Sequence, residues 1–402
     1  VDPRTGEVLA MVSLPAYDPN LFVNGISHTD YRRFMDDPAR PLFNRNVLGG
    51  VAPGSTLKPL ITLAGMDSGL RTADDRVLST GEFRIPGQRR GYRDSHGGGH
   101  GWTDARKAIA DSVNTYYYKL SLDMGIRRFD EYLALYGFGA PTGIDMSGES
   151  GGILPSPEWK AKNAKKQGPW YLGDTVITSI GQGFWKATPL QLAQGTGALA
   201  DHGRLRRPHL VKDRRDDFDK PWTPLPQPPP RLISRNPAHL EVVREGMIRT
   251  VHGPGGTARA ISHGIPYLIA GKTGTAQVIS RRGSASLDPK KLPMHLRHRA
   301  LFVGYAPADN PTIALAVVVE GGGYGGSTAA PIARKIFDAW LLGKMPEAPE
   351  KPATPAPAAS TAEAVPAAAA TSSAPAAPQS PAASQRTPAT PAAQPTRIPP
   401  TP

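Results

Sequence analysis

Pro53-Gly54-Ser55-Thr56-Leu57-Lys58-Pro59 is the stretch from which the fold of this chain can be worked out. Pro53-Gly54 interrupts any preceding element, and Pro59 fits into a helix only within the first turn, where no amide hydrogen bond is lost. The sequence therefore predicts a helix that begins near Ser55. This serine lies at the positive end of the helix dipole, and Lys58 follows three residues later on the same face.

A serine and a lysine in this arrangement suit nucleophilic catalysis. A serine hydroxyl is a poor nucleophile at neutral pH unless a base takes its proton, and lysine can act as that base when burial or a neighbouring cation lowers its pKa. We expect Ser55 to be the nucleophile and Lys58 the general base, with Lys272 as the neighbouring cation. The pair by itself is equally typical of a helix N-terminus with an exposed lysine.

Two further motifs follow in a fixed order, Ser112-Val113-Asn114 and Lys272-Thr273-Gly274-Thr275. We interpret Ser112 as the relay that returns the proton to a leaving amine, and Asn114 as a donor to the substrate amide. The combination of three motifs, and none of them alone, indicates an acyl-transfer site.

The third motif follows the apolar residues Leu268-Ile269-Ala270, which predicts a strand. An edge strand can bind an extended peptide, and Gly274 would permit close approach of a ligand backbone. We expect Lys272 and Thr273 to bind a terminal carboxylate. The backbone amides of Ser55 and Thr275 would form the oxyanion hole.

The remaining pattern predicts an α+β (mixed) fold, because helices cluster in the middle of the chain and strands late in it. Residues 8–12 suggest the second strand of a hairpin whose first strand is missing. The predicted helices are Thr103–Met124, Thr188–Asp201, Pro237–Val251 and Ala329–Leu342, and the predicted strands are Leu268–Ala270, Ala300–Ala306 and Thr312–Glu320.

Composition divides the chain and excludes several classes of function. We expect one catalytic domain over residues 1–344 and a disordered tail rich in Pro and Ala over residues 345–402. With no Cys there can be no disulfide, thiolate ligand or cysteine nucleophile.

The net charge of +13 suits an anionic polymer or membrane surface, but the basic residues are scattered among acids, which argues against nucleic acid. The longest apolar run, Ile313–Val319, is too short to span a bilayer, so a membrane anchor would have to precede Val1.

Beyond the motifs, the chain resembles class B penicillin-binding proteins over Val1–Leu342. S-x-x-K, S-D-N and K-T-G are the signature of penicillin-binding proteins and class A β-lactamases, and the middle motif here reads S-V-N. The resembling stretches are Asp2–Met11, Pro53–Pro59, Gly173-Asp174-Thr175, Gly181-Gln182-Gly183, Thr188–Gln191, Gly271–Gln277 and Leu301–Pro307. Tyr92-Arg93-Asp94, Gly99-His100-Gly101 and Trp170–Thr175 are most similar to the penicillin-binding protein 2 subfamily, which serves cell-wall elongation.

The resemblance implies a penicillin-binding transpeptidase fold like that of serine β-lactamases, with an antiparallel sheet flanked by helices and an all-helical subdomain. It implies attack on the D-Ala-D-Ala amide of peptidoglycan stem peptides on lipid-linked precursor strands, release of D-Ala, transfer to a neighbouring amine, and covalent inhibition by β-lactam antibiotics. It also implies a membrane anchor and pedestal upstream, the periplasmic face of the inner membrane as location, and a membrane glycan polymerase and elongation-complex proteins as partners.

Some relatives are similar to zinc proteins around the Y-R-D segment, with Asp, Asp, His and Cys as ligands. When the chain is matched at Asp94 and His100, Ser79 and Val113 occupy the other two places. Because a structural zinc site usually needs four good ligands, we expect no metal and no cofactor. His96 together with Asp94 leaves a zinc site as the alternative.

Three other functions share the same motifs. A β-lactamase or D,D-carboxypeptidase would need a group that deacylates the ester. The middle motif is followed by no E-x-x-L-N segment, although Glu149 and Glu158 lie in that interval. A division-specific class B transpeptidase would differ only around the Y-R-D, G-H-G and G-Q-G segments. A penicillin-binding sensor would acylate once without turnover.

Overall fold

The computed structural model describes residues 1–278 and 292–346, and from position 347 onward the predicted tail lies outside the described residues. The helices are α1 (His28–Asp36), α2 (Arg45–Leu48), α3 (Lys58–Asp67), α4 (Ala105–Ala110), α5 (Asn114–Met124), α6 (Ile126–Leu135), α7 (Pro157–Asn163), α8 (Leu172–Thr178), α9 (Pro189–Ala200), α10 (Pro237–His252) and α12 (Ala329–Leu342), with 3₁₀ turns η1 (Pro19–Phe22), η2 (Gly54–Leu57), η3 (Lys165–Gln167), η4 (Arg259–Ser262) and η6 (Met294–Leu296). The strands are β1 (Val77–Ser79), β2 (Glu82–Arg84), β3 (Gly91–Arg93), β4 (Gly101–Thr103), β5 (Arg204–Leu205), β6 (Asp213–Arg214), β7 (Thr223–Pro224), β8 (Arg231–Leu232), β9 (Ala270–Ala276), β10 (Arg299–Ala306) and β11 (Ile313–Val319).

The central sheet is antiparallel, with the strand order β11-β10-β9. β10 and β11 coincide with predicted strands within one residue, whereas β9 begins at the last residue of the predicted strand Leu268–Ala270 and continues to Ala276. The K-T-G-T motif lies on β9 as expected. In the register, Thr275 is opposite Ala300 and Lys272 is opposite Val303. Within residues 1–278 and 292–346, β9 pairs in this sheet with β10 alone, so its other side is an edge of the described sheet.

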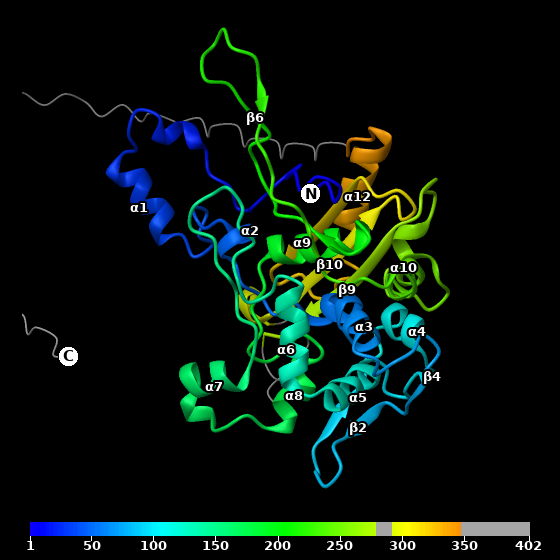
Figure 1. The fold of residues 1–402 in the computed structure, drawn as a ribbon. Helices are drawn as coiled ribbons and strands as arrows, with labels where there is room; N and C mark the ends of the chain where they lie inside the picture. Colours follow the sequence, from blue (N-terminus) through cyan, green and yellow to red (C-terminus); the bar gives the residue numbers. More distant parts are fainter. Residues whose placement is uncertain (279–291, 347–402) are drawn as a thin grey trace, which may run out of the picture. The chain divides into compact units, whose positions relative to one another are not determined.

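Helices cover both faces of this sheet, as Figure 1 shows for α12, α9 and α10. Along β10, Phe302 packs in a cluster with Phe337 of α12, whereas its neighbours Leu301 and Val303 face the larger core with Met247 of α10. This alternation is the period of two that a strand buried on both faces requires. The sequence prediction of an α+β fold with an antiparallel sheet between helices is confirmed.

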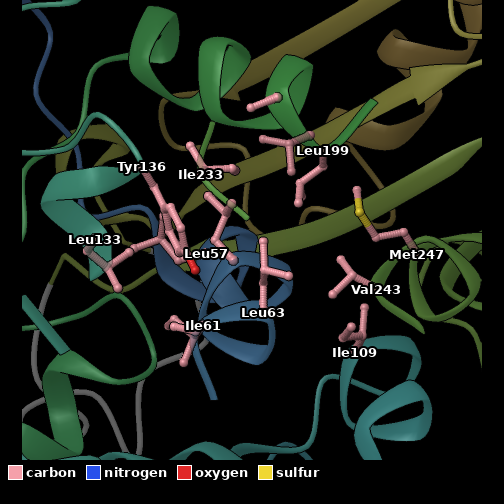
Figure 2. Close-up of a cluster of buried hydrophobic side chains, with 14 of the residues drawn as sticks. Leu57, Ile61, Leu63, Ile109, Leu133, Tyr136, Leu199, Ile233, Val243 and Met247 are labelled. Carbon is pink, nitrogen blue, oxygen red and sulfur yellow. The ribbon is translucent and has the colours of Figure 1, made fainter. Parts of the chain in front are cut away.

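The helix α3 runs through the middle of the larger core. Every residue from Lys58 to Met66 is buried, which is typical of a helix that is surrounded on all sides. Figure 2 shows Leu57 of η2, together with Ile61 and Leu63 of α3, beside residues of α4, α6, α9 and α10. The nucleophile turn therefore rests on a rigid part of the molecule.

Two sequence predictions about elements are wrong. The single helix predicted over Thr103–Met124 is two helices, α4 and α5, separated at Ser112, whose φ of +58° lies in the left-handed region and interrupts the helix. Residues 8–12 form no strand: Glu7 makes an isolated parallel bridge to His209, and residues 8–12 have no regular secondary structure. Among the described residues, no helix has the length and apolar character needed to cross a membrane.

Candidate active site

The nucleophile turn is η2, followed without a break by α3, so the helical segment begins beside Ser55 as predicted. Gly54 has a φ of +55°, and a Cβ atom there would lie 2.8 Å from the Thr275 carbonyl oxygen. Its amide donates to the Gly181 carbonyl at 2.9 Å. The turn is thus held between β9 and the Gly181 turn, with Ser55 half-buried.

Lys58 extends from the start of α3 into the interior and is fully buried. Its Nζ donates to the Ser112 carbonyl oxygen at 2.7 Å, the Ser112 Oγ at 3.2 Å and the Asn114 Oδ1 at 2.7 Å. The ring of Tyr117 lies 5.0 Å from the same atom. Within the described residues, the Ser55 hydroxyl has no hydrogen-bond partner, so no direct bond joins it to Lys58 here.

Burial lowers the pKa of Lys58 to about 7, although the negative charge of Asp94 opposes that shift. A substantial fraction of this amine is therefore neutral at physiological pH, as a general base must be. From the sequence, Lys272 is expected to be the neighbouring cation that lowers this pKa. Instead, burial is the main cause at Lys58, and the mutual repulsion adds to burial in lowering the pKa of Lys272 well below its usual value.

The motif Ser112–Asn114 forms the bend between α4 and α5. The left-handed backbone of Ser112 turns both its carbonyl and its hydroxyl toward Lys58. A serine in this conformation costs roughly 1–2 kcal/mol, and such strain clusters at functional sites. Asn114 starts α5, and its side chain completes the set of acceptors around the lysine.

The β9 motif brings Lys272, Thr273 and Thr275 to the same region, because η2 packs against β9. Lys272 is fully buried, and its Nζ donates to the Thr273 carbonyl at 2.9 Å. The Thr273 hydroxyl is 2.7 Å from that of Thr257. A Cβ at Gly274 would lie 2.7 Å from the Thr56 methyl carbon. Gly274 is thus needed for the approach of the protein's own nucleophile turn. From the sequence, its expected role is to permit the approach of a ligand backbone.

Two residues that hold the site were not assigned a role from the sequence. Gln182 donates from Nε2 to the Thr275 carbonyl at 2.9 Å and so fixes the end of β9 beside the turn. Asp94, at the end of β3, accepts hydrogen bonds from the first amides of α5. Gln182 lies in a segment quoted above only for its resemblance, and Asp94 is considered there only as a possible zinc ligand, so no local pattern assigns either residue to the acyl-transfer site.

The region in which relatives are similar to zinc proteins is arranged around Asp94. The Ser79 hydroxyl donates to Asp94 Oδ2 at 2.9 Å, and Val113 is fully buried. His100 Nε2 is 2.9 Å from the Ser95 hydroxyl and 3.8 Å from Asp94. In residues 1–278 and 292–346 there is no group of three or more His, Cys, Asp or Glu side chains that could hold a metal ion.

Comparison with known proteins identifies the family. Residues 1–338 match the penicillin-binding protein transpeptidase domain. Peptidoglycan D,D-transpeptidase MrdA of Haemophilus influenzae is 40% identical over 347 residues, which are 86% of this chain and 53% of that protein. The chain thus spans about half the length of the curated relatives it matches.

Solved structures agree with this match. PBP2 of Pseudomonas aeruginosa in complex with WCK 5153 is 43% identical, with a TM-score of 0.76 over 88% of this chain and 73% of that one. PBP2 of Helicobacter pylori in complex with MreC is 30% identical, with a TM-score of 0.74 over 85% of this chain and 59% of that one. The sequence match, the penicillin-binding transpeptidase fold and the order of the three motifs lead to one assignment: the chain belongs to the penicillin-binding protein transpeptidase family.

Proposed function

We propose that this chain is the cross-linking domain of a peptidoglycan D,D-transpeptidase that works through a Ser55 acyl-enzyme. The observation that carries the proposal is the surroundings of Lys58, a buried amine with a pKa lowered to about 7 that bridges from the nucleophile helix to Ser112 and Asn114. A buried lysine without a counter-ion in contact is costly, and its presence three residues after a half-exposed serine fits a general base.

In the acylation step, the Ser55 Oγ attacks the carbonyl carbon of the penultimate D-Ala while neutral Lys58 takes its proton. The C–N bond then breaks, and the proton passes through the Ser112 hydroxyl to the nitrogen of the departing D-Ala. Asn114 orients the substrate amide. The Lys58–Ser112 hydrogen bond provides the path for the proton.

The oxygen that becomes negative in this step would be held by the amides of Ser55 and Thr275, at the place where η2 meets β9. The peptide would lie along the free edge of β9, with its terminal carboxylate near Lys272 and Thr273. In the second step the amine of a neighbouring stem attacks the ester, forms the cross-link and releases Ser55. A β-lactam ring acylates the same serine as a mimic of D-Ala-D-Ala.

The cellular role follows from the similarity to MrdA and PBP2. We assign the domain to cell-wall elongation at the periplasmic face of the inner membrane, anchored by a preceding segment. Lipid-linked precursor strands, a membrane glycan polymerase and elongation proteins would be its partners, and a PBP2 solved with MreC supports the last of these. The domain would span residues 1–344, followed by a tail.

The nucleophile is tested by intact mass spectrometry with a fluorescent penicillin, followed by mapping of the modified peptide. Wild type should gain one adduct at Ser55, and Ser55→Ala should gain none. Thr56→Val is the matched control, because it removes the adjacent hydroxyl, which donates to the Pro53 carbonyl and is not free to react. An adduct on any other side chain, or no adduct at all, would overturn the proposal.

A further inference from the structure

The side chain of Asp94 lies buried against the start of α5, although Asp94 itself directly follows β3. It accepts hydrogen bonds from the amides of Asn114 at 2.6 Å, Thr115 at 3.0 Å and Ser95 at 2.8 Å, and from the Ser79 hydroxyl at 2.9 Å. Helix α5 has no cap of its own at Val113. Asp94 therefore satisfies the free amides at the start of the helix that bears the middle motif.

The backbone beside Asp94 fixes the direction of the Asn114 side chain. The Arg93 carbonyl accepts from Asn114 Nδ2 at 3.2 Å and from the Tyr118 hydroxyl at 3.2 Å. Because the Asn114 nitrogen is used in this way, its oxygen points to Lys58 Nζ. The end of β3 thus holds the amide in the orientation in which it can accept from the lysine.

Asp94 also acts on Lys58 by its charge. Burial would raise the pKa of the Asp94 carboxyl, but the hydrogen bonds from Asn114, Thr115 and Ser95 outweigh burial and keep that pKa below its usual value. The carboxylate is therefore ionised and opposes the lowering of the Lys58 pKa.

Other groups surround these two charges. Lys58 is also faced by the amine of Lys272 on β9, whose pKa is lowered by burial, and by the ring of Tyr117 on α5. Asp94 is faced by His100, whose pKa is lowered by burial, so that this imidazole is neutral at pH 7. Asp94 is thus the negative counter-charge that offsets the burial of the Lys58 amine.

We propose that Asp94 is a positioning residue, which holds the Ser112–Asn114 segment and Lys58 in the arrangement that acylates Ser55. The proposal rests on the function proposed above and deepens it. The Y-R-D segment thereby gains a role through contacts in this structure: Arg93 orients the Asn114 amide, and Asp94 caps α5 and supplies the charge.

The test is the pH dependence of Ser55 labelling by a fluorescent penicillin in wild type and Asp94→Asn. Loss of the negative charge favours the neutral amine, so the midpoint of the acid limb should move to lower pH by about one unit. The rate at the plateau should fall roughly tenfold, because the Thr115 amide loses its acceptor. Asp94→Glu, which keeps the charge, should restore the wild-type midpoint.

Asp145→Asn is the matched control. Asp145 likewise accepts from two backbone amides, those of Leu210 and Val211, and its pKa is also lowered by these bonds. It belongs to a loop that contacts neither Lys58 nor Asn114 through any hydrogen bond of the described residues. Its substitution should lower the melting temperature and leave the midpoint unchanged, because a purely structural carboxylate has no effect on Lys58.

An Asp94→Asn protein that folds and keeps the wild-type midpoint would refute the positioning role, while the proposed function would stand as long as wild type is labelled at Ser55. No labelling of wild type at any pH would refute the proposed function itself.

If Asp94→Asn does not fold, the labelling rate of Ser79→Ala provides the test. This variant lacks one donor to Asp94 and should label several-fold more slowly than Ser68→Ala, whose hydroxyl donates only within its own turn. Equal rates would overturn the proposal.

Discussion

Lys58 is the residue whose protonation state controls the proposed reaction, and this gives a pH dependence with a definite sign. Burial lowers its pKa to about 7, and only the neutral amine can take the Ser55 proton. Ser55 labelling should therefore slow roughly tenfold per pH unit below pH 7 and level off above it. Stopped-flow labelling between pH 5.5 and about 9 measures this limb. A rate that stays constant across that range would contradict the assignment of Lys58 as the base.

We expect Lys272 to lower the stability of the folded protein, although it would bind the carboxylate of the substrate. Its pKa is well below the usual value in the folded protein, because burial and the nearby Lys58 disfavour the charge, so the unfolded chain binds more protons at neutral pH. Lys272→Met should therefore raise the melting temperature by roughly 2–4 °C at pH 7. This gain should shrink as the pH rises toward the ordinary lysine pKa.

The same substitution should slow Ser55 labelling roughly 10- to 100-fold, since the hydrogen bond from the Lys272 amine to the penicillin carboxylate is lost. Lys162→Met, at an exposed position of α7, is the control and should change neither quantity. A lower melting temperature for Lys272→Met would show that the buried ammonium contributes to the fold instead of costing stability.

At the scale of elements, the sequence predicted those units whose signals are local. The short apolar strands β10 and β11 and the closing helix α12 all appear as expected. The break at Ser112 could not be predicted, because serine has no intrinsic preference for a left-handed backbone. That conformation is imposed by the contacts of Ser112 with Lys58, 54 residues away in the sequence.

The packing of η2 on β9 makes a prediction about Gly54. In Gly54→Ala the alanine backbone would have to adopt a φ near +55°, and its methyl group would collide with the Thr275 carbonyl oxygen. The turn should therefore move away from β9. We expect Ser55 labelling to fall at least about 100-fold, since a displacement on the order of 1 Å is that costly. The Ser55 and Thr275 amides would then no longer point at one oxygen, as the proposed oxyanion hole requires.

Gly69→Ala separates backbone strain from this collision. Gly69 has a φ of +73° at the exposed end of α3, and nothing lies within 4 Å of the added methyl group. Its substitution should cost about 1 kcal/mol of unfolding free energy and leave labelling unchanged. Similar labelling rates for both variants would show that contact between η2 and β9 is not needed for acylation.

At the scale of the molecule, the sequence located the chemical groups but not the supports that hold them. Ser55, Lys58, Asn114 and Lys272 could be found because each stands in a short motif with a chemical reason for its spacing. The hydrogen bond from Gln182 to the Thr275 carbonyl joins residues 93 positions apart in the sequence. A single sequence carries no signal for such a contact, because any polar side chain at a turn is compatible with solvent exposure.

The lifetime of the acyl-enzyme distinguishes a transpeptidase from a β-lactamase. Deacylation by water needs a base over the ester, and Glu149 and Glu158, the two glutamates considered for that role from the sequence, are engaged elsewhere. Glu149 accepts from the amide and hydroxyl of Thr142 and from the Gly143 amide. Glu158 is exposed on α7, 3.9 Å from Arg127.

The benzylpenicillin adduct should therefore persist for at least tens of minutes, because neither carboxylate is available to activate a water molecule. Intact mass spectrometry after removal of free antibiotic gives the decay rate. Glu149→Gln and Glu158→Gln should leave that rate unchanged, since Glu149 is held by Thr142 and Gly143 and Glu158 lies beside Arg127. Loss of the adduct within seconds in wild type, abolished by either substitution, would instead assign the chain to hydrolysis and identify the residue that performs it.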